Sequence, residues 1–222
     1  EVWNTSSGNA HLDRAGSITP NIVVNTKLKK IKVDYHIPSM RQCASCHNIN
    51  DRITPIGPRA HFLNHQNQLA QWSQRGLLRD LPVDPSNIPT RAVWSDTTKP
   101  LDARAKAYLE INCAHCHNPK GNARNTGLFL SADRESDSIE LGVCKTPVAA
   151  GLASGGNSYD IQPGNAKKSI LYYRMTQSHL AVKMPQLGRS IVHEEGNALV
   201  RDWINQMKYI DCKAGNRIKL AN

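Results

Sequence analysis

The sequence predicts a mainly α-helical chain of two tandem units, with a small β element near the N-terminus. Three observations lead to this prediction. The pentapeptide Cys-x-x-Cys-His occurs twice, at residues 43–47 and 113–117. A proline-rich segment at 82–100 separates the two copies and has neither a helical nor a strand period. Residues 31–37 alternate apolar with polar side chains, which is typical of a half-buried strand.

The first unit, residues 1–96, is expected to begin with strands. Val2-Trp3-Asn4 should form a short strand, and the alternation at 31–37 should end at Pro38. A single helix should follow the first pentapeptide, because one stripe recurs at helical spacing, through His61, His65, Leu69 and Trp72. Gly76 is expected to end that helix.

The second unit, residues 97–222, is expected to contain three helices. Asp102 is a plausible N-cap for a helix that delivers Cys113 at its end. Asn165 should cap a short helix that carries Ile170, Leu171 and Met175. The last helix, about 194–207, has an apolar face and should cross the first helix of this unit with Trp203 in the contact.

The repeated pentapeptide is the attachment signature of c-type haem. Two thiols on one helical turn add across the two vinyl groups of a haem, and the adjacent His ligates the iron. One copy alone would also suit a zinc half-site or a redox pair, but two copies, each followed by Asn, favour two haem groups. The covalent attachment sites are then Cys43, Cys46, Cys113 and Cys116, and the proximal ligands are His47 and His117.

Composition supports two haem c cofactors. Hydrophobic residues make up 39% of the 222 residues, and Phe occurs only twice. Neither unit is expected to bury enough apolar surface to offset its chain entropy without a haem plate in its core.

Met184 is the expected sixth ligand of the second haem. It lies in a loop with Pro185 and Gly188 beside it, between two expected helices, whereas Met175 continues an apolar helical face. A thioether suits haem iron, and His/Met ligation raises the reduction potential relative to His/His ligation.

The sixth ligand of the first haem is less defined. Met40 lies too near Cys43 to reach across the ring, so His61 or His65 is the best candidate, with an open site or a ligand from elsewhere in the chain as the alternatives. His115, inside the second motif, points away from its own iron and is expected at the surface.

Two further pairs of residues complete the expected site. Cys144 and Cys212 remain after the four haem thiols are assigned, and an oxidising compartment favours a disulfide between them. Arg174 and Arg189 flank the expected Met184 loop, where a guanidinium would pair well with a haem propionate.

A helix that ends in Cys-x-x-Cys-His, a Met-Pro loop and a final amphipathic helix resemble a class I cytochrome c domain. The chain is also similar to a family of secreted bacterial haem proteins of uncharacterised role, through "IPSMRQCASCHN", "NQLAQWSQRGLL", "NCAHCHNPKG", "YDIQPGNAKKSILYYRM" and "MPQLGRSIVHEEG". The resemblance covers most of the chain. It implies two tandem cytochrome c-like haem domains in a dihaem periplasmic protein.

Charge and hydropathy indicate the kind of partner. The formal net charge is +10, and the basic residues are mostly scattered with few aromatic residues between them, which argues against nucleic acid. An acidic redox protein fits better. No apolar run is long enough to span a membrane. Covalent haem attachment implies export across the inner membrane, and the abrupt start at a strand suggests that the chain belongs to a longer multidomain protein.

These observations favour a periplasmic cytochrome that carries electrons between redox partners, more than an enzyme. Two alternatives remain. A dihaem peroxidase-like oxidoreductase would need an open or displaceable site at the first haem. A haem-based sensor is suggested only by the expected further N-terminal part of the chain. If the first haem is His/His ligated, it should have the lower potential of the two.

Overall fold

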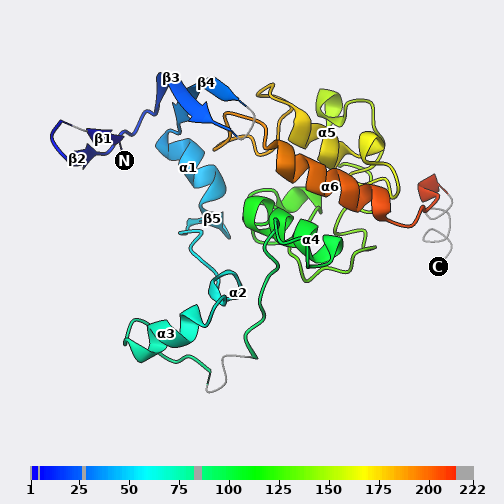
Figure 1. Cartoon of the computed structure of the whole chain (residues 1–222). Helices are drawn as coiled ribbons and strands as arrows, with labels where there is room; N and C mark the ends of the chain where they lie inside the picture. The colour runs from blue at the N-terminus through cyan, green and yellow to red at the C-terminus, as the bar shows by residue number, and fades with distance from the viewer. Residues whose placement is uncertain (1, 5, 27–28, 83–86, 214–222) are drawn as a thin grey trace.

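The computed structural model describes residues 2–4, 6–26, 29–82 and 87–213, so residues 83–86 of the proline-rich segment lie outside the described residues. Figure 1 shows the helices and strands. The strands are β1 Val2–Asn4, β2 Asn9–His11, β3 Ser17–Asn25, β4 Lys30–Ile37, β5 Asn48–Ile49 and β6 Arg52–Ile53. The α-helices are α1 Met40–Cys46, α2 Ala60–Leu63, α3 Gln68–Gln74, α4 Leu101–Cys113, α5 Ile170–Thr176 and α6 Glu194–Gln206, with short 3₁₀ turns η2 Arg124–Thr126, η3 Gly151–Ser154 and η4 Ala166–Lys168.

The N-terminal strands form three antiparallel two-stranded ribbons, β1–β2, β3–β4 and β5–β6. The strands expected at residues 2–4 and 31–37 are therefore confirmed. On β4 the apolar face is half-buried at Ile31, Val33 and Ile37, but Tyr35 is exposed. His36 is exposed, and its Nε2 lies 3.2 Å from Gln42 Oε1.

Residues 60–74 form two short helices, so the prediction of one helix through His61 and Trp72 is wrong. The chain turns between α2 and α3, where Gln66 and Asn67 have φ of 50° and 59°. These left-handed conformations interrupt the helical period, so the expected stripe does not lie on one helix face. Leu69, on α3, is buried, and the helical run does end just before Gly76.

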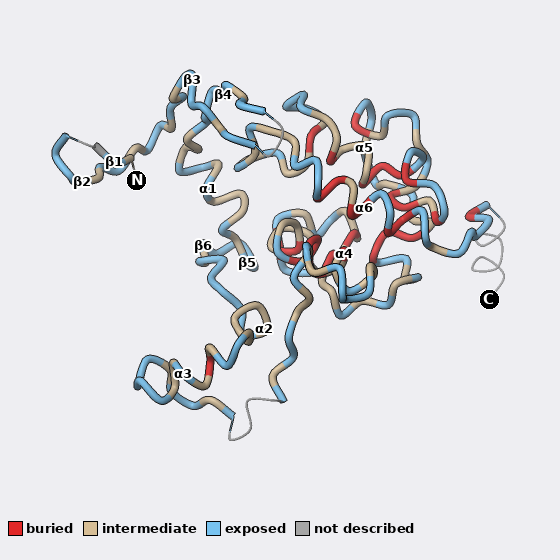
Figure 2. Tube along the Cα trace, in the orientation of Figure 1, coloured by how far each residue is buried: buried red, intermediate tan, exposed pale blue. Residues whose placement is uncertain are grey.

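The hydrophobic core lies in the second unit. Figure 2 shows the buried residues gathered around α4, α5 and α6. Among the described residues of 1–96, Leu69 is the one buried hydrophobic side chain. Tyr108 and Leu109 of α4 and Trp203 of α6 share the main cluster, which confirms the expected helix crossing. Met175 is buried there too, as expected of a core residue.

Two caps differ from the expected ones. The residue before α4 is Pro100, and Asp102 lies in the first turn, where its Oδ1 accepts from Ser136 Oγ at 2.8 Å and from Trp203 Nε1 at 2.8 Å. Asp102 thus joins α4 to α6 and is not the N-cap. Asn165 caps the 3₁₀ turn η4 by accepting from the Lys168 amide, and α5 begins after Ser169.

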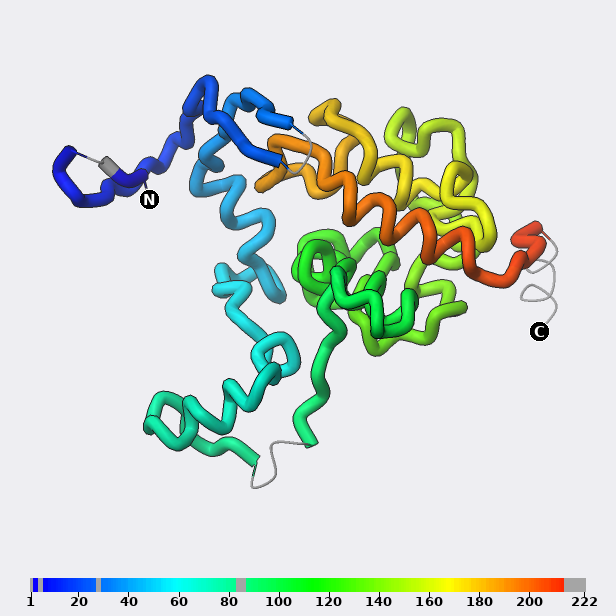
Figure 3. Tube along the Cα trace, viewed as in Figure 1, coloured from blue at the N-terminus to red at the C-terminus, as the bar shows by residue number. Residues whose placement is uncertain are grey.

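The first unit extends away from the core and returns to it. Figure 3 shows the trace descending through α1, passing α2 and α3, and climbing back to α4. At the far end of the second unit, Cys144 and Cys212 form the predicted disulfide. None of the described helices has the length and apolar character needed to cross a bilayer.

Candidate functional site

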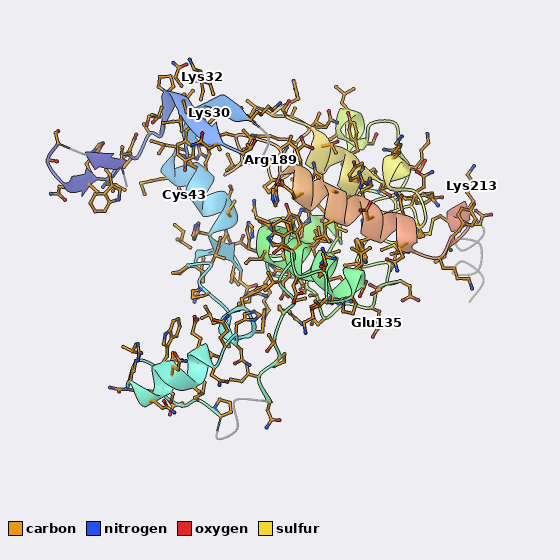
Figure 4. The ribbon with its side chains drawn as sticks, viewed as in Figure 1. Lys30, Lys32, Cys43, Glu135, Arg189 and Lys213 are labelled. Carbon is orange, nitrogen blue, oxygen red and sulfur yellow. A yellow bond between two sulfur atoms is a disulfide. The ribbon has the colours of Figure 1, made fainter. Side chains whose placement is uncertain are left out.

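The first Cys-x-x-Cys-His motif forms the end of α1. A capping box starts this helix: the Gln42 amide donates to Ser39 Oγ at 3.4 Å, and the Ser39 amide donates to Gln42 Oε1 at 2.9 Å. Cys43 and Cys46 therefore lie one turn apart, and His47 is the C-cap. Figure 4 labels Cys43 on α1. No side chain of α1 is fully buried.

The second motif turns off the end of α4. Cys113 is the last residue of the helix, and the His117 amide donates to the Cys113 carbonyl at 2.9 Å. The Ala123 amide then donates to the Cys116 carbonyl at 3.1 Å. Gly121 lies against that carbonyl so closely that any Cβ would clash with it. A glycine is thus required for the loop to fold back over the motif.

The His117 side chain is oriented by the backbone of the following loop. Its Nδ1 lies 3.3 Å from the Leu128 carbonyl, and the Leu130 amide donates to the His117 carbonyl at 3.0 Å. A metal-ligating His typically donates its second ring N–H to such a carbonyl, which directs Nε2 to the metal. Burial lowers the pKa of His117 to about 4, so the imidazole is neutral near pH 7 and able to ligate.

The two motifs lie against each other. The ligand atoms of Cys46, His115 and Cys116 all lie within 4.8 Å of one another, and Cys116 Sγ lies 3.9 Å from the Ser45 carbonyl. The tails of the motifs are joined as well. The Asn50 amide donates to the Lys120 carbonyl at 3.0 Å.

The thiols of the two motifs have very different environments. The Cys116 thiol beside Cys46 stabilises the Cys46 thiolate and so lowers the pKa of Cys46, and the same contact raises the pKa of Cys116. His115 adds to the effect on Cys46. Burial raises the pKa of Cys113 to about 12. Of the two neighbouring thiols Cys46 and Cys116, Cys46 is thus the one that ionises first.

Side chains and backbone hold the loop that contains Met184 in place. The Met184 amide donates to the Arg174 carbonyl at 3.0 Å, and Arg174 Nε donates to the Val182 carbonyl at 2.9 Å. Lys183 is a buried residue, and its Nζ donates to the Arg189 carbonyl at 2.7 Å. Met184 itself is half-buried. The loop predicted to carry a ligand is therefore fixed at both ends.

This loop also faces the first motif. An open groove of about 480 Å³ lies between α1 and the loop. It is lined by Arg41, Gln42, Ser45, Leu180, Gln186 and Leu187. The loop with Met184, which is expected to ligate a haem at the second motif, thus borders α1, the helix of the first motif.

Arg174 and Arg189 donate hydrogen bonds to backbone carbonyls in and beside the Met184 loop. The Arg189 guanidinium donates to the carbonyls of Met175 and Gln177. Figure 4 labels Arg189 on the segment between α5 and α6. Burial lowers the pKa of Arg174, and the charge of Arg174 helps to lower the pKa of His117. Their contact with propionates stays a prediction.

His61 belongs to an ion-pair cluster with Glu110, one helical turn before Cys113. Glu110 Oε2 accepts from Arg91 Nε at 2.7 Å, and Oε1 accepts from Arg59 Nη1 at 3.1 Å. His61 Nε2 lies 3.3 Å from Oε1 without hydrogen-bond alignment. Burial and the two arginines lower the pKa of His61 against the opposing effect of Glu110.

This cluster bears on the predicted sixth ligand of a haem at the first motif. His61 Nε2 already faces the Glu110 carboxylate, so ligation by His61 requires that contact to break. His65 is half-buried in the turn between α2 and α3, and its amide donates to the Leu63 carbonyl at 2.9 Å. His61 and His65 both stay predicted ligands.

The sequence did not predict the cross-motif contacts or the Glu110 cluster. Arg59 and Arg91 lie 51 and 19 residues from Glu110. Such pairs leave no local pattern. One signal was present: Glu110 is an acidic residue in an otherwise apolar stretch of helix, and a buried carboxylate requires a partner.

The residues present fit two covalently held haems. Each motif places two thiols one turn apart with a His directly after them, and the His117–Leu128 contact leaves Nε2 for iron. The unburied face of α1 also offers a surface that an apolar plate would cover.

No protein-family model, curated protein or solved structure matches this chain. The resemblance to cytochrome c domains and to secreted bacterial haem proteins accordingly stays a prediction from the motifs.

Proposed function

We propose that this chain is a dihaem c-type cytochrome that carries electrons between redox partners outside the inner membrane. The observation that carries the proposal is the meeting of the two motifs. Cys46 and Cys116, which lie 70 residues apart in the chain, have their sulfurs within 4.8 Å. Two attachment points this close favour electron exchange over two independent haem sites.

Each residue of the two motifs has a defined role in this proposal. Cys43, Cys46, Cys113 and Cys116 provide the thioether bonds, and His47 and His117 ligate iron. The haem groups supply the one-electron chemistry. Leu128 fixes the ring of His117 through its carbonyl. Met184 offers a thioether from a loop that Arg174 and Lys183 hold in place.

The surface charge suits an acidic redox partner. The chain has 28 Lys and Arg against 18 Asp and Glu. Opposite net charge accelerates the encounter of transient redox pairs, and the rate falls as salt screens the attraction. Export across the inner membrane is part of the proposal, since covalent haem attachment of this type takes place on the outer side of that membrane.

The test is expression with the export signal and haem-attachment machinery of a suitable bacterium. We expect two haems per chain, a low-spin spectrum at both irons, and no reaction with carbon monoxide or peroxide. A chain that folds and is exported without haem would overturn the proposal. A high-spin fraction that binds carbon monoxide or peroxide would instead favour the peroxidase or sensor alternative.

Met184→Ala tests the ligand assignment within the same preparation. We expect the His117 haem to lose its low-spin signature and its potential to fall, while the His47 haem keeps its spectrum. Met175→Leu is the control, because Met175 is a buried core residue. An unchanged spectrum in Met184→Ala would remove Met184 from the ligand set.

A further inference from the structure

His115 is the one histidine within a motif that has no part in holding haem. In the structure it does not stand alone at the surface, because its ring meets thiols from both motifs. Cys46 comes from the end of α1, and Cys116 follows α4. All three residues are half-buried, and their ligand atoms lie within 4.8 Å of one another.

The spacing of these atoms suits a small thiophilic cation. Tetrahedral zinc has Zn–S near 2.3 Å and Zn–N near 2.0–2.1 Å, which sets neighbouring ligand atoms roughly 3.5–3.8 Å apart. Atoms that lie up to 4.8 Å apart therefore need to approach one another by about 1.3 Å or less to reach a zinc geometry. Two sulfurs and one imidazole nitrogen form a donor set that zinc prefers.

Contacts outside the cluster keep the three ligands together. The Asn50 amide binds the Lys120 carbonyl at 3.0 Å, and Arg124 pairs with Asp51 at 3.3 Å. Both contacts join the segment after Cys46 to the segment after Cys116. A cation would consequently bind a site whose ligands are already close together, and it would not need to bring two separate segments of the chain into contact.

We propose that the haem-free chain binds one zinc ion through Cys46, His115 and Cys116, with water in the fourth position. Binding releases the protons of the two thiols and the waters of hydrated zinc that the three ligands replace, and it forms two zinc–sulfur bonds and one zinc–nitrogen bond. The same two sulfurs carry thioether bonds in the haem-loaded chain, so zinc at this site and complete haem loading exclude each other. The site requires only the haem-free chain and does not depend on the proposed function.

The alternative is chelation within each motif, by Cys43 with Cys46 or Cys113 with Cys116. The structure separates the two possibilities. Cys43 is exposed and Cys113 packs against the core, and neither belongs to the cluster. Cys43→Ser and Cys113→Ser are therefore matched controls for Cys46→Ser and Cys116→Ser.

The experiment titrates the full-length haem-free chain with Zn²⁺, after circular dichroism shows that the wild type is helical without haem and that each variant keeps its helix content. A haem-free wild type without helix would overturn the proposal, because the site would not be assembled. We expect one ion per wild-type chain. Losing an outer-shell partner alone costs about 10–100-fold in affinity, so Cys46→Ser, Cys116→Ser and His115→Ala should each lose at least about 100-fold. Cys43→Ser and Cys113→Ser should bind as the wild type does. An equal loss in the control variants, or no binding, overturns the proposal.

Alkylation of the wild-type chain gives a second readout that needs no variant. With Zn²⁺ present, peptide mapping should show Cys46 and Cys116 protected from iodoacetamide and exposed Cys43 modified. Protection of Cys43 together with Cys46 would show chelation within the motif and contradict the cross-motif site. The haem-loaded protein should bind no ion at this position.

Discussion

Replacing Glu110 with glutamine should weaken the joint between the first unit and α4. The change keeps the shape of the side chain but removes the charge that faces Arg59 and Arg91. Glu110 is 2% exposed at its side chain, Arg91 22% and Arg59 48%. Breaking a buried charge pair costs about 3–5 kcal/mol, whereas an exposed pair contributes about 0–1 kcal/mol.

The magnitude follows from these exposures. The Arg91 contact dominates, because Arg59 is half in solvent and its contribution is screened. We expect a loss of about 3 kcal/mol, near the lower end of the range for a buried pair. In a protein of this size, 1 kcal/mol shifts the unfolding midpoint by about 2–4 °C, so the midpoint should fall by about 6–12 °C.

The assay is thermal unfolding of the haem-loaded protein, followed by far-ultraviolet circular dichroism. Asp51→Asn is the matched control, since Arg124 and Asp51 also join the two units but are 44% and 75% exposed. The control should lose less than about 1 kcal/mol. Equal shifts in Glu110→Gln and Asp51→Asn would refute the argument from burial.

Two further changes test other contacts. Replacing Cys144 and Cys212 with serine opens a loop with a sequence separation of 68 and should lower the free energy of unfolding by about 4 kcal/mol in the loop-entropy account. The unfolding midpoint should fall, and reductant should no longer change it. A midpoint equal to that of the oxidised wild type would contradict this expectation. His61→Gln should reduce the loss of stability on acidification. The pKa of His61 lies below its ordinary value of 6.5, so neutral His61 contributes stability that is complete above pH 6.5 and is lost as the pH falls through the folded pKa. An unchanged pH slope of the unfolding free energy in denaturant titrations from pH 7 to pH 5 would count against that role.

Local patterns predicted the elements whose cause is local. The apolar face of 194–207 placed α6, and the alternation at 31–37 placed β4, because period alone decides these elements. Residue counting gave the Cys144–Cys212 disulfide. The spacing of the two motifs likewise indicated where each pair of thiols would share a helical turn.

Where distant residues decide the structure, the sequence was less informative. The stripe from His61 to Trp72 had a helical period, yet the turn at Gln66 and Asn67 divides it. Asp102 has the chemistry of an N-cap but is engaged by Trp203, 101 residues away. The contact between Cys46 and Cys116 depends on how the whole first unit returns to α4, which no single segment encodes.

The location of the core has a consequence for how the chain is made. The ribosome releases the segment with Cys43 and Cys46 first, long before Glu110 and Lys120 emerge. Among the described residues up to 96, Leu69 alone is a buried hydrophobic side chain, so the nascent first half has little to fold around while it waits. A fragment that ends near residue 96 should consequently be difficult to purify in folded form and should be cleaved readily by proteases. Recombination that transplants this half into another protein would have to bring α4 with it.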